Sequence, residues 1–239
     1  MPKLGKRTIA VQKLVDSNRH YGPAEALALA KETATAKFDE TIEVHLTTTL
    51  DGRHADQQLR GSVVLPHGLG KAVRVVVFAE GEAATDAMAA GAEEVGSDDL
   101  IKRVSEGFTN FDVALAQREL MGKVGGLGRV LGPRGLMPNP RNNTVLAPED
   151  IGKAVTEALA GRIDFRLDRT NLVHSSIGKA SFSAEDLLDN MSALVGEIVK
   201  SRPTGSKGQM LRGVTVTATM GPGINVDIAQ TLALATSDA

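Results

Sequence analysis

Cysteine and tryptophan are absent from this 239-residue chain, and aromatic residues make up only 3% of it. The lack of cysteine excludes disulfides, thiolate catalysis and cysteine-ligated metals, and it fits a reducing compartment. Binding of single-stranded nucleic acid usually needs several aromatic rings on which bases stack. If the chain binds nucleic acid, the composition therefore favours recognition of RNA shape and backbone over stacking on the bases of a single strand.

Long apolar runs and an excess of one charge are also missing. No apolar stretch approaches the length of a membrane span, and residues 1–18 lack the apolar centre of a secretory signal, so we expect no membrane contact. The net charge of −2 does not favour general polyanion binding. Basic residues instead gather locally, which indicates recognition of a folded RNA at a defined surface. These residues are Lys3, Lys6, Arg7 and Lys13; Arg118, Lys123, Arg129, Arg134 and Arg141; and Lys200, Arg202, Lys207 and Arg212.

The two outer parts of the chain share a pattern of alternating strands. Apolar residues recur at every second position, which predicts half-buried strands. The expected strands are 40–50, 60–65, 162–168, 172–177 and 211–221, with 162–168 and 172–177 paired around a turn at 169–171. Helices are expected after Pro23, which suits a first helical position, and after Ser183, which with Asp186 forms a capping-box pattern.

The middle of the chain follows a different pattern. Continuous apolar runs at 72–79 and 111–116 are typical of strands covered on both faces, and short helices separate them. Strands alternating with helices predict βαβ units and a small parallel sheet. The sequence therefore predicts an α/β protein: an α+β domain split between residues 1–67 and 160–239, and an inserted Rossmann-like domain at 68–159.

The most unusual segment is GGLGRVLGPRGLMPNPR, from Gly125 to Arg141. Its density of glycine and proline predicts a structured loop or a sharp transition from helix to loop. Arg129, Arg134 and Arg141 suit phosphate recognition. The spacing GxGxxxG also occurs in dinucleotide enzymes, but here it does not follow a strand directly and a proline closes it.

Catalytic and cofactor motifs fail elsewhere too. The three Gly-Lys-Ala triplets lack the Ser or Thr and the earlier glycine of a phosphate-binding loop. The five histidines are scattered, and neither a metalloprotease HExxH nor a nucleophile-elbow GxSxG occurs. We therefore expect no enzyme, cofactor or metal. A nucleotide-dependent enzyme built on the central region remains the alternative, and a general RNA chaperone is a third possibility.

Several segments together resemble one protein family. LGPRGLMPNP is similar to the central motif of the bacterial large-subunit ribosomal protein L-one family. The segments 35–45, 58–71, 161–182 and 207–223 resemble other parts of that family in the same order. One position departs from the family, because Gly126 stands where a lysine is usual and so removes one cation.

The resemblance implies a function and a binding surface. It implies a cytoplasmic structural protein, a monomer within the ribosome, which binds large-subunit rRNA at the mobile stalk near the tRNA exit site. It also implies help in releasing deacylated tRNA and repression of translation through the leader of its own mRNA. The RNA-facing residues that it implies are Lys37, Phe38, Thr41, His174, Lys179, Ser181, Phe182, Thr217, Thr219, Met220 and Gly221, with a secondary RNA or tRNA contact at Arg129, Arg134 and Arg141.

Overall fold

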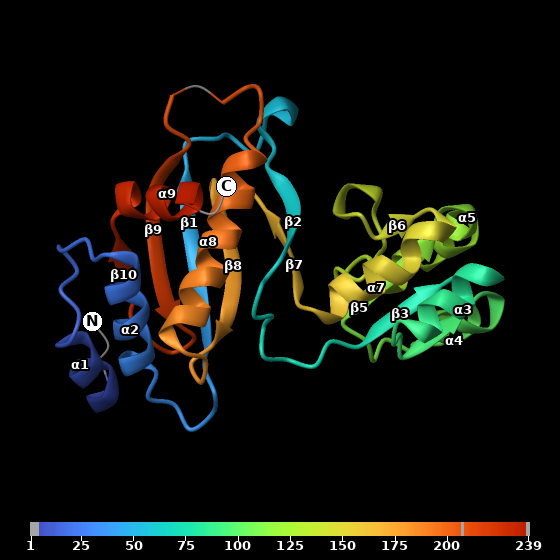
Figure 1. Ribbon diagram of the computed structural model, residues 1–239, viewed down its shortest axis with the longest axis horizontal. Coiled ribbons are helices and arrows are strands. Elements are labelled where there is room, and N and C mark those ends of the chain that lie inside the picture. Colours follow the sequence, from blue (N-terminus) through green and yellow to red (C-terminus); the bar gives the residue numbers. More distant parts are fainter. Residues whose placement is uncertain (1–4, 207, 238–239) are drawn as a thin grey trace. The chain divides into compact units, whose positions relative to one another are not determined.

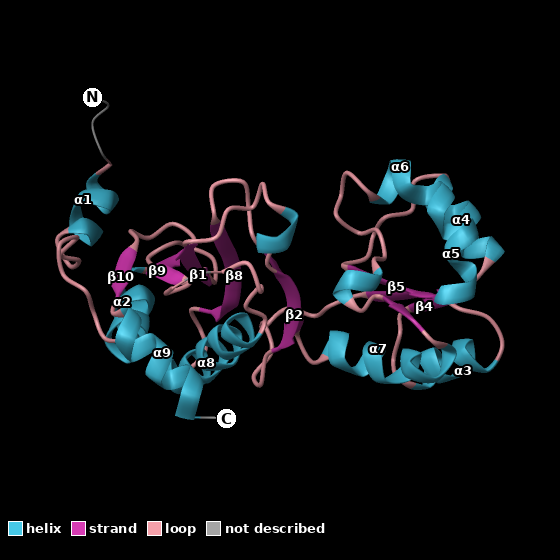
Figure 2. Cartoon of the chain, turned by 90° about the horizontal axis from the view of Figure 1, so that it is seen from above, coloured by secondary structure: helices cyan, strands magenta, loops and turns pink. Residues whose placement is uncertain are grey.

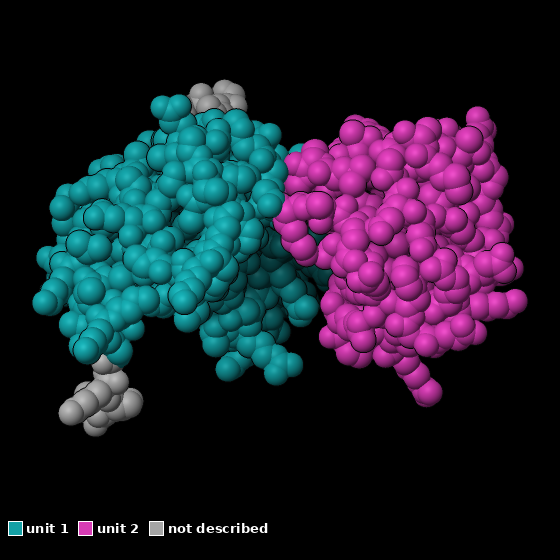
Figure 3. Space-filling model, turned by 90° about the horizontal axis from the view of Figure 1, so that it is seen from below, with its two compact units in different colours: residues 1–70, 163–239 teal, residues 71–162 magenta. Residues whose placement is uncertain are grey.

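The computed structural model describes residues 5–206 and 208–237, so Lys3 and Lys207 lie outside the described residues. The chain divides into two compact units (Figure 3). Unit 1 comprises Met1–Gly70 and Ile163–Ala239, and unit 2 comprises Lys71–Arg162. The sequence placed the two crossings at 67/68 and 159/160, and the structure has them at 70/71 and 162/163.

Unit 1 is built on a four-stranded antiparallel sheet in the order β10-β9-β1-β8 (Figure 1). Alternation decides its two faces: every second residue of β1 is buried, and the residues between them are partly exposed. Helices α2, α8 and α9 cover the buried face (Figure 2). The other face, with Thr41, Glu43, His45 and Thr47 of β1, is called the open face below. The strands are β1 (Thr41–Thr48), β8 (Leu172–Lys179), β9 (Leu211–Ala218) and β10 (Ile224–Val226).

The helices of unit 1 begin as their sequences predict. Helix α2 (Pro23–Thr33) has Pro23 at its first position. Helix α8 (Ala184–Lys200) starts with the complete capping box of Ser183 and Asp186, and its apolar stripe is buried against the sheet. Helices α1 (Lys6–Gln12) and α9 (Ile228–Ser237) and the short turn η1 (Ala55–Gln57) complete the unit.

The pairing of the next two strands differs from the prediction. Strand β7 (Arg162–Arg166) pairs with β2 (Arg60–Val64) in a separate two-stranded sheet. The expected hairpin between β7 and β8 is reduced to one bridge, Leu167 to Val173. The Asp168 carboxylate accepts hydrogen bonds from the backbone N–H groups of Thr170 and Leu172, at 2.8 and 2.7 Å, and this tight turn redirects the chain.

Unit 2 has a parallel sheet in the order β4-β3-β5-β6. Strand β3 (Val75–Phe78) is buried along its whole length, as expected for a strand covered on both faces. Figure 2 shows α3 and α7 on one side of the sheet and α4, α5 and α6 on the other. The elements are β4 (Glu94–Gly96), β5 (Val113–Gln117), β6 (Val145–Leu146), α3 (Glu82–Ala89), α4 (Asp98–Ser105), α5 (Met121–Val124), α6 (Gly128–Leu131) and α7 (Ile151–Leu159).

The glycine-rich motif is more helical than expected. The 3-10 turn η3 (Gly125–Leu127) joins α5 to α6, and the irregular loop begins only at Gly132. Leu127 and Leu131 are buried, so core packing outweighs the low helix propensity of the glycines. Of the two predicted forms, the structure shows the transition from helix to loop. Three further 3-10 turns are η2 (Arg118–Leu120), η4 (Pro140–Asn142) and η5 (Pro148–Asp150).

Candidate nucleic-acid interface

Three strand ends of unit 1 meet at one end of the sheet. Thr41 begins β1 opposite Lys179, the last residue of β8, and Thr219 follows the end of β9. The Thr41 N–H donates to Thr219 Oγ1, and the Thr219 N–H donates to the Thr41 carbonyl, both at 3.0 Å. Lys179 Nζ donates to Thr41 Oγ1 at 2.9 Å. The fold therefore gathers hydroxyl groups and a cation from three distant parts of the sequence.

Two large apolar side chains project into solvent beside these strand ends. Phe38 is 56% exposed and Met220 is 57% exposed. Lys37 is exposed next to Phe38. Because neither Phe38 nor Met220 is part of the core, folding does not explain an apolar residue at either position. We call Lys37, Phe38, Thr41, Lys179, Thr219 and Met220 the strand-end site.

A buried carboxylate holds this site in shape. Glu40 is 1% exposed, and its two carboxylate oxygens accept from the N–H groups of Ala36, at 2.7 Å, and Met220, at 2.8 Å. It ties the loop before β1 to the loop after β9. Sequence reasoning missed Glu40. The signal was an acidic pair, Asp39 and Glu40, inside a segment expected to face RNA. Carboxylates repel phosphates, so acids in such a segment are expected to form hydrogen bonds within the protein.

Two of the expected RNA-facing side chains are already engaged within the protein. The Ser181 hydroxyl donates to the Asp39 carboxylate at 2.8 Å, and the Ser181 N–H donates to the same group at 3.1 Å. The half-buried Phe182 ring lies against Gly70 and Gly178, where a Cβ would come within 2.7 and 3.0 Å of ring carbons. The Phe182 carbonyl accepts from Lys31 Nζ.

The turn after β9 is held by a side-chain hydroxyl of that strand. The Thr217 hydroxyl lies 2.9 Å from the Ala218 carbonyl and 3.2 Å from the Pro222 carbonyl. Gly221 does not adopt a positive φ, so its backbone conformation does not require glycine. A Cβ at Gly221 would lie 3.3 Å from both Thr33 Oγ1 and Ala218 Cβ. Added bulk at this position therefore meets the protein itself.

His174 lies apart from the strand-end site, further along the open face. It is paired with His45 of β1, with 2.8 Å between their Nδ1 atoms. Partial burial, followed by the neighbouring His174, holds the pKa of His45 below its usual value, and Glu43 opposes this shift.

The three arginines of the glycine-rich motif belong to unit 2 and are all exposed. Arg134 donates to the Thr109 hydroxyl. Gly126 lies in η3 with open space where its Cβ would point, so a lysine would fit there.

Across the described part of the chain, no group of three or more His, Asp or Glu side chains is placed to hold a metal. In the same residues, no helix combines the length and the apolar character that crossing a membrane requires.

Comparison with known proteins shows the family of the chain. Residues 30–222 match the ribosomal protein L1p/L10e family. This chain belongs to that family. The match includes every residue of the strand-end site. Membership of a family of ribosomal proteins confirms the prediction of a structural protein rather than an enzyme, and the α/β architecture agrees with it.

Similar proteins match the chain over almost its full length. Large ribosomal subunit protein uL1 of Chloroflexus aggregans is 52% identical over 95% of this chain and 97% of its own length. The uL1 protein of a Dehalococcoides mccartyi strain is 53% identical over 94% of both chains. The uL1 protein of Chloroflexus aurantiacus is 51% identical over 95% of this chain and 96% of its own.

Proposed function

We propose that this chain is a structural constituent of the large ribosomal subunit, works in the cytoplasm, and grips rRNA of the mobile stalk with its strand-end site. The observation that carries the proposal is the exposure of Phe38 and Met220 beside Lys37, Lys179 and two threonines. Apolar side chains can stack on a splayed base or on ribose, hydroxyls can bond 2′-hydroxyls, and lysines can pair with phosphates. Family membership makes rRNA the expected ligand.

The rigidity of the site supports the same proposal. Glu40 fixes the Met220 loop, Asp39 fixes Ser181, and the strand ends are bonded directly to one another. A site that is ordered before binding loses little conformational entropy when RNA docks. Recognition of a folded RNA by shape needs such a fixed surface.

The test removes the two exposed apolar side chains. Phe38→Ala should weaken binding of a stalk-rRNA fragment by about 1–3 kcal/mol, roughly five- to 150-fold, and Met220→Ala should weaken it in the same direction. Neither change should lower the melting temperature by more than a degree or two, because both side chains are exposed. Filter binding and circular dichroism provide the two measurements.

Met88→Ala is the matched control, because Met88 is 61% exposed in unit 2. It should leave rRNA affinity unchanged. If the Phe38 and Met220 variants fold and bind as the wild type does, the strand-end site is not the RNA-binding surface.

We further propose the two finer roles that the family resemblance implies. Exposed Arg129, Arg134 and Arg141 supply phosphate contacts for tRNA leaving the exit site. Their joint replacement by glutamine should weaken tRNA crosslinking to ribosomes and leave rRNA binding intact.

Repression through the protein's own mRNA leader uses the strand-end site, so that leader and rRNA should compete for the protein. Simultaneous binding of both RNAs would contradict a shared site.

A further inference from the structure

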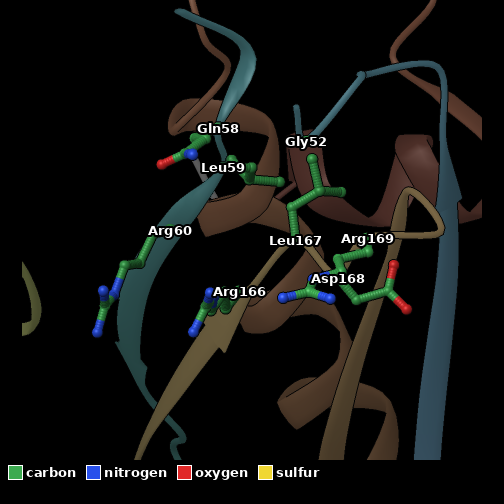
Figure 4. A pocket seen from close by; sticks show the side chains of 8 residues that line it. All are labelled: Gly52, Gln58, Leu59, Arg60, Arg166, Leu167, Asp168 and Arg169. Carbon is green, nitrogen blue, oxygen red and sulfur yellow. The ribbon is translucent and has the colours of Figure 1, made fainter. Parts of the chain in front are cut away.

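A pocket lined by three arginines lies in unit 1, outside the strand-end site. Arg60 of β2, Arg166 at the end of β7 and Arg169 in the following turn surround a cavity of about 560 Å³ (Figure 4). Arg166 and Arg169 are exposed. Alternation along β7 buries Ile163 and Phe165 in the core, so Arg166 projects from the opposite side of the strand. We call Arg60, Arg166 and Arg169 with Gly52 and Asp168 the arginine pocket.

The acidic residue of the pocket is occupied elsewhere. Asp168 accepts hydrogen bonds from the Thr170 hydroxyl and N–H and from the Leu172 N–H. These bonds, with the nearby His174, hold the pKa of Asp168 at about 2, so it is ionised near neutral pH. In Figure 4 its carboxylate points away from Arg166, whereas the Arg169 side chain turns toward Arg166. The lining residues carry three positive charges against one negative charge.

The shape and chemistry of the pocket suit a phosphate group. Guanidinium groups present planar pairs of N–H donors that match phosphate oxygens, and they keep their charge at all relevant pH values. The pocket is open to solvent and contains no aromatic lining residue, which does not suit a nucleobase or an apolar ligand. A phosphodiester on the surface of a larger molecule fits these features.

The pocket lies at the far end of the sheet from the strand-end site. Asn171, in the turn beside it, bonds the N–H of Thr48 through its carbonyl, at 2.9 Å, and the N–H of Gly52 through its amide oxygen, at 3.3 Å. Thr41 and Thr48 are the two ends of β1. Seven residue steps of about 3.3 Å place these ends about 23 Å apart. In Figure 4 the helices lie behind the strands, and the arginine side chains are on the near side.

We propose that the arginine pocket holds a backbone phosphate of the same RNA that the strand-end site binds. The two contacts lie toward opposite ends of β1, and this arrangement aligns that RNA with the strands across the open face. This inference rests on the proposed function. The strand-end site supplies specific contacts, and the arginine pocket fixes the direction in which the RNA leaves them.

The experiment measures the salt dependence of rRNA binding for Arg166→Gln/Arg169→Gln. Loss of two phosphate-neutralising charges should reduce the slope of log affinity against log salt by about 1.4–1.8, which is twice about 0.7–0.9. At 0.1 M salt the affinity should fall about 25- to 60-fold. Arg118→Gln/Lys153→Gln removes two exposed cations from unit 2 and should leave the slope unchanged. If the double variant does not fold, Arg169→Gln alone should reduce the slope by about 0.7–0.9.

The possible failures are distinguishable. If the wild type does not bind the stalk-rRNA fragment, the proposed function is wrong and this inference falls with it. If the wild type binds and the pocket variant binds with the same slope, only the pocket inference is wrong. Titration with inorganic phosphate separates the two sources of phosphate. A phosphate-dependent rise in melting temperature that the double variant loses, with an unchanged RNA slope, would assign the pocket to a free anion and overturn the RNA assignment.

Discussion

At the scale of single residues, the expected interface depends on side chains that are buried within the protein. Glu40 is the clearest case, because its buried carboxylate joins Ala36 to Met220. Glu40→Ala would leave two backbone N–H groups without acceptors and open a cavity. We expect it to lower the free energy of unfolding by about 2–4 kcal/mol, as measured by urea denaturation.

Glu40→Gln is the matched control, since it keeps the volume and one acceptor oxygen. It should destabilise the protein less than alanine does, and both variants should weaken rRNA binding because the Met220 loop loses its anchor. Unchanged stability in Glu40→Ala would show that Glu40 does not hold the site together. A single sequence shows such residues only in part: the acidic pair in KFDET indicates a structural role, but the pattern does not tell which of the two acids is buried.

At the scale of elements, local signals predicted most of the fold, and pairings between distant segments were the exception. The capping box of Ser183, the alternation in β1 and the continuous apolar run of β3 each correspond to an observed element. The prediction that β7 and β8 form a hairpin was wrong, because β7 pairs with β2 instead. A short turn between two strands does not determine which partner each strand pairs with. The gathering of strand ends required the family resemblance, since Thr41 and Thr219 are 178 positions apart.

The glycine-rich motif allows a prediction at the same scale. Gly126 lies in a helical turn with free space at its Cβ, so Gly126→Ala should stabilise unit 2 by about 0.5–1 kcal/mol. Gly126→Lys should be tolerated and should restore the cation that is usual in the family. Thermal unfolding followed by circular dichroism measures both effects.

Gly132→Ala is the contrasting variant for the same measurement. A Cβ at Gly132 would lie 2.5 Å from the Gly128 carbonyl oxygen, so alanine there should be destabilising. Equal effects at positions 126 and 132 would contradict the described path of the motif.

At the scale of the whole molecule, the separate cores of the two units predict that unit 1 folds without unit 2. Its core contains no residue of unit 2, and unit 2 has cores on both faces of its own sheet. Removal of residues 71–162, with a short flexible linker from Gly70 to Ile163, should leave a protein that unfolds cooperatively. It should bind stalk rRNA within a few-fold of the intact chain. A product that folds but does not bind would place essential RNA contacts in unit 2.

The split of unit 1 also has a consequence for the order in which the protein matures. Strand β1 is made early, but both of its neighbours in the sheet, β8 and β9, lie beyond the whole of unit 2. Unit 2 is continuous and can fold as soon as it leaves the translating ribosome, whereas β1 must wait with an unpaired apolar face. The strand-end site is not complete until synthesis has passed Met220. On the proposed function, a chain that ends earlier lacks the rRNA-binding surface, so only a finished copy can bind rRNA.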